Sequence, residues 1–217
     1  MYHNPVLLNE SINALNIIPE GIYVDATFGG GGHSKVILGY LSTGRLIAFD
    51  QDPDSAENIP DNDQILFIGE NFRFLKNFLK INGIKEIDGV LADLGVSSHQ
   101  FDTPERGFST RYDGPLDMRM DKNNPTTARQ IIHEYEEDEL TRMFPAYGEL
   151  PNAAKLAKMI VRSRNLREIV TTSDLRNALE EALPRGRENQ YLARIYQAIR
   201  LEVNDELNAL KDLLEQG

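Results

Sequence analysis

Three aspartates stand at the ends of apolar runs, and one of them leads into four consecutive glycines. Asp25 ends the run "GIYVDAT" before Gly29–Gly32, Asp50 ends "RLIAFD", and Asp93 lies in "LADLGVSS". If these runs are parallel strands, their carboxyl ends meet at one edge of a sheet, where open α/β sheets bind nucleotide-like ligands. A carboxylate there can accept hydrogen bonds from ribose hydroxyls or from an exocyclic amine. The alternatives are a structural turn for the glycines and a helix cap for Asp50; the neighbouring Asp52, followed by proline, could supply that cap instead.

The glycine loop has the spacing of a methyl-donor loop rather than that of a dinucleotide loop. The fingerprint G-x-G-x-x-G fails, because its third glycine position is Ser34 when counted from Gly29 and Lys35 when counted from Gly30. The pattern D-x-T-x-G-x-G, from Asp25 to Gly31, is close to the D-x-G-x-G-x-G loop of S-adenosylmethionine-dependent methyltransferases. We therefore expect S-adenosylmethionine as the cofactor, with a dinucleotide-dependent oxidoreductase as the alternative.

The first half of the chain alternates short apolar runs with helical stretches. Four runs rich in Ile, Val, Leu and Phe predict buried parallel strands at residues 21–27, 45–50, 64–69 and 87–95. Strands that alternate with helices predict a doubly wound, Rossmann-like α/β sheet. A turn-rich stretch of about thirty residues follows Gly95, and loops of that length are often functional. From Ala128 onward the pattern is helical.

The composition is that of a globular protein without cysteine chemistry. Of the 217 residues, 41% are hydrophobic, 26% are charged and none is cysteine, so we expect a reducing cytoplasmic environment without disulfides. The amino-terminal residues lack the features of a signal peptide, and no uncharged apolar run approaches the length of a membrane span. With four histidines in no clustered spacing, we predict no metal site.

The charge is distributed unevenly. A formal net charge of −11 argues against a nucleic-acid partner. Residues 151–200, however, hold ten Lys or Arg and five Asp or Glu, a net charge of +5 that leaves −16 for the rest. This basic block indicates either phosphate contacts or a solvated helical face. Arg106, Arg111 and Arg119 in the turn-rich stretch leave a similar choice between nucleic-acid contact and a loop that packs its methionines and exposes its charges.

Six stretches together make the chain resemble the bacterial small-subunit (16S) ribosomal RNA cytosine-N4 methyltransferase family over essentially its whole length. They are "HNPVLLNESI", "DATFGGGGHS", "AFDQDP", "DLGVSSHQFD", "ERGFS" and "DGPLDMRMD". The resemblance implies a class I methyltransferase fold, with a Rossmann-like donor domain at residues 1–104 and a loop and helical substrate-recognition domain at residues 105–217. It also implies an rRNA (cytosine-N4-)-methyltransferase that acts on the small ribosomal subunit in the cytoplasm. The oligomeric state is left open, with a homodimer among the alternatives.

The same resemblance implies roles for seven residues. The donor loop would be lined by Gly31, Gly32 and His33, the ribose held by Asp50, the adenine flanked by Phe72, and the reacting end closed by Asp93 and Gln100. Asp93 is also the predicted catalytic residue, because an oxygen acceptor can orient an exocyclic amine. The Pro-Pro-aromatic motif of amine methyltransferases is replaced by Leu-Gly-Val after Asp93, so this motif alone does not establish amine methylation. For His33 the alternative is a general base.

The chain ends where members of the family continue into further strands. We therefore expect a fragment that holds four strands of a sheet that would have about seven by resemblance to this fold. The strand at residues 87–95 would then be an exposed edge. Besides the oxidoreductase, the remaining alternative is a non-catalytic RNA-binding or assembly protein that retains a donor pocket.

Overall fold

The computed structural model describes residues 5–216, which form two compact units. The sheet unit comprises Met1–Ser98 with Leu207–Gly217, and the helical unit comprises His99–Glu206. The predicted division after residue 104 therefore lies close to the observed one. The last segment differs, because residues 207–217, which we placed with the helices, belong to the sheet unit. The first two residues of the motif "HNPVLLNESI", His3 and Asn4, lie outside the described residues.

The sheet has four parallel strands, as predicted. They are β1 (Ile22–Asp25), β2 (Arg45–Phe49), β3 (Ile65–Ile68) and β4 (Gly89–Leu91). Their order is β3-β2-β1-β4, and Val24 in the middle of β1 pairs with Ile47 of β2 and Val90 of β4. Because β1 and β2 are covered on both faces, their residues are almost continuously apolar. Within residues 5–216, β4 pairs with β1 only, so β4 is an edge strand of the sheet.

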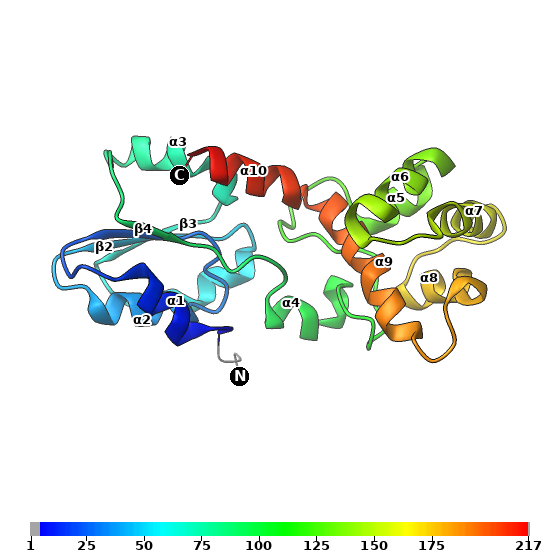
Figure 1. Cartoon of the computed structure of the whole chain (residues 1–217), viewed down its shortest axis with the longest axis horizontal. Coiled ribbons are helices and arrows are strands. Elements are labelled where there is room, and N and C mark those ends of the chain that lie inside the picture. The colour runs from blue at the N-terminus through cyan, green and yellow to red at the C-terminus, as the bar shows by residue number, and fades with distance from the viewer. Residues whose placement is uncertain (1–4, 217) are drawn as a thin grey trace. The chain divides into compact units, whose positions relative to one another are not determined.

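Helices cover both faces of the sheet (Figure 1). One face carries α1 (Leu8–Leu15) and α2 (Gly32–Tyr40), whose Ile12, Ile37 and Leu38 pack with Tyr23 and Leu46. The other face carries α3 (Leu75–Ile81) and α10 (Glu206–Gln216). Two short 3-10 helices, η1 (Pro53–Asn58) and η2 (Phe72–Phe74), follow β2 and β3. The sheet is thus the middle of three layers.

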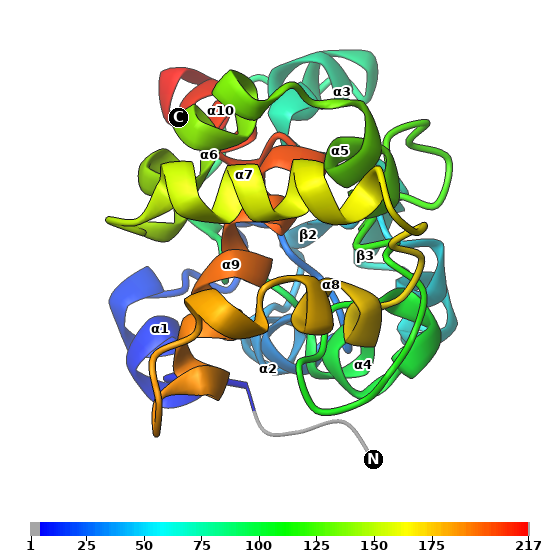
Figure 2. The same ribbon diagram turned by 90° about the vertical axis from the view of Figure 1, so that its right-hand side faces the viewer.

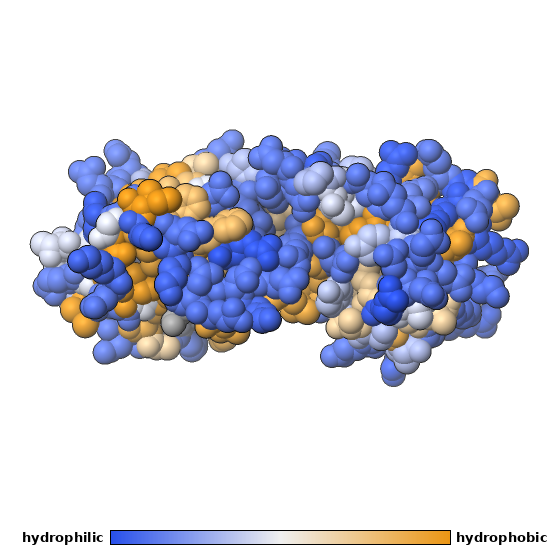
Figure 3. Space-filling view, turned by 90° about the horizontal axis from the view of Figure 1, so that it is seen from above, coloured by the Kyte–Doolittle hydropathy of each residue, from blue (hydrophilic) through white to orange (hydrophobic). Residues whose placement is uncertain are grey.

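The final helix, α10, joins the sheet unit through both apolar and polar contacts. Leu213 packs into the core with Ile47 and Phe49 of β2. Asp212 forms an ion pair of 2.9 Å with Arg73, and the Gln216 side chain accepts a hydrogen bond from the Lys76 main-chain N–H. These contacts are the reason that residues 207–217 do not follow the helical domain. On this side of the unit the surface is partly hydrophobic (Figure 3), and α3 and α10 carry the exposed side chains of Ile81 and Leu214.

The helical unit is built around α6, α7 and α9, and α6 packs against both of the others (Figure 2). Its elements are α4 (Ser98–Asp102), η3 (Pro104–Arg106), α5 (Ala128–Glu134), α6 (Glu137–Gly148), α7 (Ala153–Arg164), α8 (Thr172–Ala178), η4 (Glu180–Ala182) and α9 (Glu188–Val203). The Thr171 side chain caps the start of α8 by accepting a hydrogen bond from the Asp174 N–H. None of the helices among residues 5–216 has the length and apolarity that a bilayer crossing requires.

Candidate active site

Asp25 braces the turn that follows β1. Its carboxylate is buried, and it accepts hydrogen bonds from the Ser34 hydroxyl at 2.7 Å and from the Thr27 N–H at 3.1 Å. Burial raises the pKa of Asp25, and the bonds from Ser34 and Thr27 oppose that rise. Both oxygens are thus used to join the end of the strand to the first turn of α2. Asp25 therefore shapes the loop from inside and does not face a ligand.

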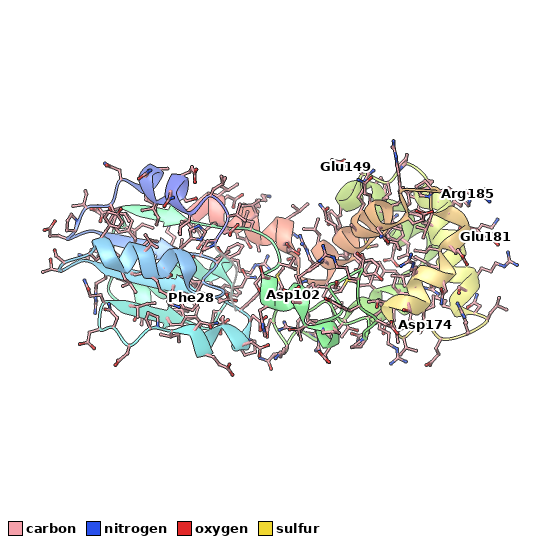
Figure 4. The ribbon with its side chains drawn as sticks, turned by 90° about the horizontal axis from the view of Figure 1, so that it is seen from below. Phe28, Asp102, Glu149, Asp174, Glu181 and Arg185 are labelled. Atoms are coloured by element: carbon pink, nitrogen blue, oxygen red, sulfur yellow. The ribbon has the colours of Figure 1, made fainter. Side chains whose placement is uncertain are left out.

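The glycines of the loop are required by backbone angles and by close packing. Gly29 and Gly31 have positive φ of 51° and 71°, which disfavours residues with a side chain. A Cβ at Gly31 would lie 2.9 Å from the ring of Phe28, and a Cβ at Gly32 would lie 2.3 Å from the ring of Pro5 (Phe28 is labelled in Figure 4). Protein neighbours therefore occupy the space beside Gly31 and Gly32. Glycine at these two positions lets the loop turn tightly into α2.

His33 presents an unsatisfied polar atom at the start of α2. Its side chain is 6% exposed, and its Nε2 has no hydrogen-bond partner among the described residues. A buried polar atom without a partner costs about 1–3 kcal/mol, so such atoms usually meet a ligand or an ordered water. The first turn of a helix also leaves N–H groups unpaired. The beginning of α2 is thus suited to a polar part of a bound molecule.

Asp50 lies at the end of β2 and holds the loop from the other side. Its Oδ2 accepts a hydrogen bond of 2.6 Å from the Gly29 N–H, and its Oδ1 accepts one of 2.8 Å from the Asp52 N–H. Burial raises the pKa of Asp50 to about 6, although these two bonds favour the ionised form. Each oxygen still has capacity for one further donor, which matches a pair of neighbouring hydroxyl groups. The separate role predicted for Asp52 is confirmed, since its side chain caps η1 by accepting from the Asp54 N–H.

Asp93 lies just after β4 with an exposed side chain, and its main chain is tied to the glycine loop. The Asp93 N–H donates a hydrogen bond of 2.7 Å to the Thr27 hydroxyl. The Thr27 N–H in turn donates to Asp25. A chain of hydrogen bonds therefore runs from the buried Asp25 to the exposed Asp93. The segment after β4 is fixed relative to the loop while the carboxylate of Asp93 stays accessible.

Phe72 starts η2 and packs, partly buried, against the core of the sheet unit. Its position is set by Asn71, whose side chain accepts from the Arg73 N–H and donates a hydrogen bond of 2.8 Å to the Gln51 side chain. Since Gln51 directly follows Asp50, the turn that carries Phe72 is tied to the end of β2. The predicted ribose and adenine positions therefore belong to connected segments.

The MraW methylase family matches residues 1–217. Three relatives named "Ribosomal RNA small subunit methyltransferase H" are similar to the chain over nearly its full length. The protein of Flavobacterium johnsoniae is 56% identical over 217 residues, which are 100% of this chain and 72% of the relative. That of Cytophaga hutchinsonii is 55% identical over 219 residues, covering 100% of this chain and 74% of the relative. That of Bacteroides thetaiotaomicron is 50% identical over 214 residues, covering 98% and 70%.

The chain belongs to the MraW methylase family. This membership confirms the resemblance drawn from the six motifs, and the parallel four-stranded sheet is consistent with the expected Rossmann-like methyltransferase fold. Among the residues predicted to bind the donor, Gly31, Gly32, His33, Asp50, Phe72 and Asp93 all belong to the sheet unit. Gln100 differs, because it is buried in α4 of the helical unit. Its predicted place beside Asp93 stays a prediction.

Two of the three arginines in the turn-rich stretch of this methylase hold the loop together. The Arg106 side chain is 6% exposed and donates to the carbonyls of Arg119 and Met120 at 2.9 and 3.1 Å. Arg119 pairs with Asp117 at 2.8 Å and donates to the carbonyls of Lys122 and Asn124. The methionines are packed as the structural alternative predicted, but the two arginines bind inside the loop and are not free charges. Arg111 remains exposed, over the ring of Phe101.

Sequence reasoning missed several residues that position the site. Ser34 and Thr27 supply the hydroxyls next to Asp25 and Asp93, and Asn58 donates a hydrogen bond of 3.2 Å to the Gly29 carbonyl. The signal for Thr27 was its place in D-x-T-x-G-x-G, where the general methyltransferase loop has glycine. The signal for Ser34 was its place at the third glycine position of the dinucleotide fingerprint, where it broke the match. Among residues 5–216, no group of three His, Asp or Glu side chains could hold a metal ion.

Proposed function

We propose that the chain transfers a methyl group from S-adenosylmethionine to the exocyclic N4 amine of a cytidine in small-subunit ribosomal RNA. The observation that carries the donor half is the meeting of Asp50, the glycine loop with His33, and the Asp93 segment at the carboxyl ends of β2, β1 and β4. The acceptor half is supported by family membership and by the names of the relatives. Action on ribosomal RNA implies a cytoplasmic place of work.

The residues of the sheet unit fit the donor. Asp50 has one remaining acceptor site on each oxygen for the two ribose hydroxyls, and the unpartnered His33 Nε2 can pair with a polar group held at the start of α2. Phe72 offers an aromatic ring for the adenine, and Gly31 and Gly32 shape the main chain beside it. S-adenosylmethionine supplies an electrophilic methyl group when bound. We propose Gln100 as a further donor contact near the reacting end.

Asp93 orients the acceptor. Its exposed carboxylate can accept a hydrogen bond from the N4 amine, which fixes the direction of the nitrogen lone pair. The amine becomes strongly acidic as it gains the methyl group, so Asp93, a main-chain carbonyl or water can take its proton and no strong base is needed. Most of the rate enhancement would come from alignment. A cytidine stacked in RNA has to leave the stack to reach Asp93.

A methyl-transfer assay on small ribosomal subunits tests the proposal. The chain should incorporate tritiated methyl groups at cytidine N4, and Asp93→Ala should lose most of that incorporation. Asp61→Ala is the matched control, because it removes another exposed carboxylate of the sheet unit without touching the site. Calorimetric titration with S-adenosylmethionine and with NAD distinguishes the methyltransferase from the oxidoreductase alternative. Binding of NAD alone would overturn the donor assignment, whereas donor binding without transfer would favour the assembly-protein alternative.

A further inference from the structure

The helix α7 carries a row of cations on a single face. The sequence of α7, Ala153–Arg164, contains four Lys or Arg and no Asp or Glu. Lys155, Lys158 and Arg162 are exposed. At about 100° per residue these three lie within roughly 60° of one another around the helix axis, and they span about 10 Å along it. The residues that α7 buries, Ala153, Leu156, Ala157 and Ile160, lie on the opposite side.

The outer face of α7 is open within the helical unit. Figure 2 shows α7 along the near side of that unit, with no other helix of the unit in front of it. None of Lys155, Lys158 and Arg162 forms an ion pair with any residue from 5 to 216; Lys155 donates to the Glu181 main-chain carbonyl at 2.8 Å. No carboxylate among the described residues is thus ion-paired with this face, although the residue that Lys155 contacts through its main chain, Glu181, is itself acidic.

Other cations of the basic block are occupied differently. Arg164 donates to the carbonyls of Ile132 and Tyr135 at 2.8 and 2.7 Å, and so ties α7 to the end of α5. Arg194 donates to the carbonyls of Gly148 and Glu149 at the end of α6. Arg200 pairs with Glu206 at 2.8 Å. These three arginines hold helix ends together, so they are not available to a polyanion.

Three of the remaining exposed cations, Arg167, Arg176 and Arg185, lie near acidic residues in space or in sequence. The pKa of Asp174 is lowered mainly by the hydrogen bond from the Thr171 main-chain N–H, and the charge of Arg167 contributes to a smaller extent. The pKa of Glu188 is lowered mainly by main-chain hydrogen bonds, with a smaller contribution from the charge of Arg176. Arg185 follows Glu180 and Glu181 by only a few residues, so both signs of charge occur in this segment (Glu181 and Arg185 are labelled in Figure 4). The net positive charge of residues 151–200 is thus concentrated on α7.

We propose that the exposed face of α7, defined by Lys155, Lys158 and Arg162, binds the phosphate backbone of the RNA substrate; this rests on the proposed function. A row of cations spaced along a helix matches a row of backbone phosphates and carries no information about the base sequence. The face would therefore position the RNA, and the choice of cytidine would be made elsewhere. A chain with a formal net charge of −11 repels RNA as a whole, so a local basic face is needed to hold it.

The test compares two triple variants of the whole chain that lose the same charge. The first is Lys155→Gln, Lys158→Gln and Arg162→Gln, and the control is Arg176→Gln, Arg185→Gln and Arg187→Gln, which are also exposed cations of the helical unit. Glutamine keeps the helix propensity of lysine and arginine. Binding to a fluorescently labelled small-subunit rRNA transcript is measured from 50 to 300 mM KCl, with thermal unfolding and donor titration on each variant.

The first variant should bind the transcript about 100-fold more weakly at 0.1 M salt, and its slope of log K against log salt should flatten by about 2, because three phosphate contacts are lost. The control should stay within about threefold of the unmodified chain, with the slope unchanged. Equal losses of RNA affinity in both variants would mean that the net charge of the chain, and not the α7 face, determines binding, which would overturn the proposal. If the first variant keeps its fold and its donor binding and binds the transcript as tightly as the unmodified chain, the face of α7 is only a solvated surface and the proposal is wrong. If the unmodified chain binds RNA in this way but never transfers methyl groups, the proposed function fails and the binding face stands.

Discussion

The partly buried carboxylate of Asp50 predicts that donor affinity falls as the solution becomes acidic. Its pKa is raised to about 6 by burial, and both of its oxygens already accept a main-chain N–H. In the proposed donor site, two ribose hydroxyls would donate hydrogen bonds to the ionised carboxylate of Asp50. A protonated carboxyl group would accept fewer hydrogen bonds, because one of its oxygens carries a hydrogen atom. Donor binding should therefore require ionised Asp50.

The magnitude follows from the ionised fraction. With a pKa of about 6, Asp50 is about 97% ionised at pH 7.5 and about 9% ionised at pH 5. If only the ionised form binds, the dissociation constant should be about tenfold larger at pH 5 than at pH 7.5. Binding near pH 6 should also release protons, because the bound donor favours the ion.

Folding stability should change in the opposite direction. The pKa of Asp50 is raised from 3.8 to about 6, so its contribution to stability is fully present below pH 3.8 and is lost as the pH rises through about 6. Asp50→Asn removes this loss. The free energy of unfolding of the variant, relative to the unmodified chain, should therefore improve by about 2 kcal/mol between pH 4 and pH 7. The variant also leaves one main-chain N–H without its acceptor, which lowers its stability at every pH.

Isothermal titration with S-adenosylmethionine at several pH values, in buffers of different ionisation enthalpy, measures both affinity and proton release. Asp50→Asn should bind weakly throughout and lose the step near pH 6. A dissociation constant that is flat from pH 7.5 to pH 5, in a chain that remains folded, would refute the reasoning. The same pH step in the variant would assign the titration to another group.

Two further changes separate positioning from stability. Thr27→Val removes the hydroxyl that accepts from the Asp93 N–H at 2.7 Å; single-turnover methyl transfer should slow about tenfold, the equivalent of one lost hydrogen bond. Donor affinity should stay within about twofold, and an equal loss in donor affinity would show that Thr27 acts on the loop instead. Asn204→Ala removes the side chain that accepts from the Met120 N–H and donates to the Met118 carbonyl, both buried. Its free energy of unfolding in urea should fall by about 2–3 kcal/mol, whereas exposed Asn177→Ala should change little; equal effects would contradict the buried role of Asn204.

The strands and the loop could be predicted because their signals are local. Continuous apolar runs that end in Asp or Gly mark strands covered on both faces, and β1, β2 and β3 lie within a few residues of the predicted ranges. The predicted strand at residues 87–95 is too long, since the structure has only Gly89–Leu91 in β4. Beyond β4 the Asp93 N–H pairs with the Thr27 side chain and not with a main-chain carbonyl of β1, a contact between segments 66 residues apart. Periodicity does not report such a contact.

The domain assignment of α10 and the roles of the arginines could not be predicted for a related reason. The apolar stripe of α10 indicates that one face is buried, but not against which part of the protein. An arginine looks the same in sequence whether its side chain is free or donates to main-chain carbonyls, as those of Arg106 and Arg164 do. In both cases the deciding fact is the identity of the partner, which the fold alone supplies.

Burial separates the roles of the three aspartates that end the apolar runs. Asp25 is buried and uses both oxygens inside the loop, so it cannot reach a substrate amine. Each oxygen of Asp50 accepts a hydrogen bond from a main-chain N–H and can accept one more. This arrangement suits a pair of hydroxyl groups that stay in place, but it holds the carboxylate too firmly to move with a reacting amine. Asp93 alone combines an exposed carboxylate with a fixed main chain. An orienting residue needs both properties, because the carboxylate has to meet a substrate that arrives from solvent and has to hold it in one direction. The unequal burial of three residues of the same type therefore supports the proposed role of Asp93 at the reacting end.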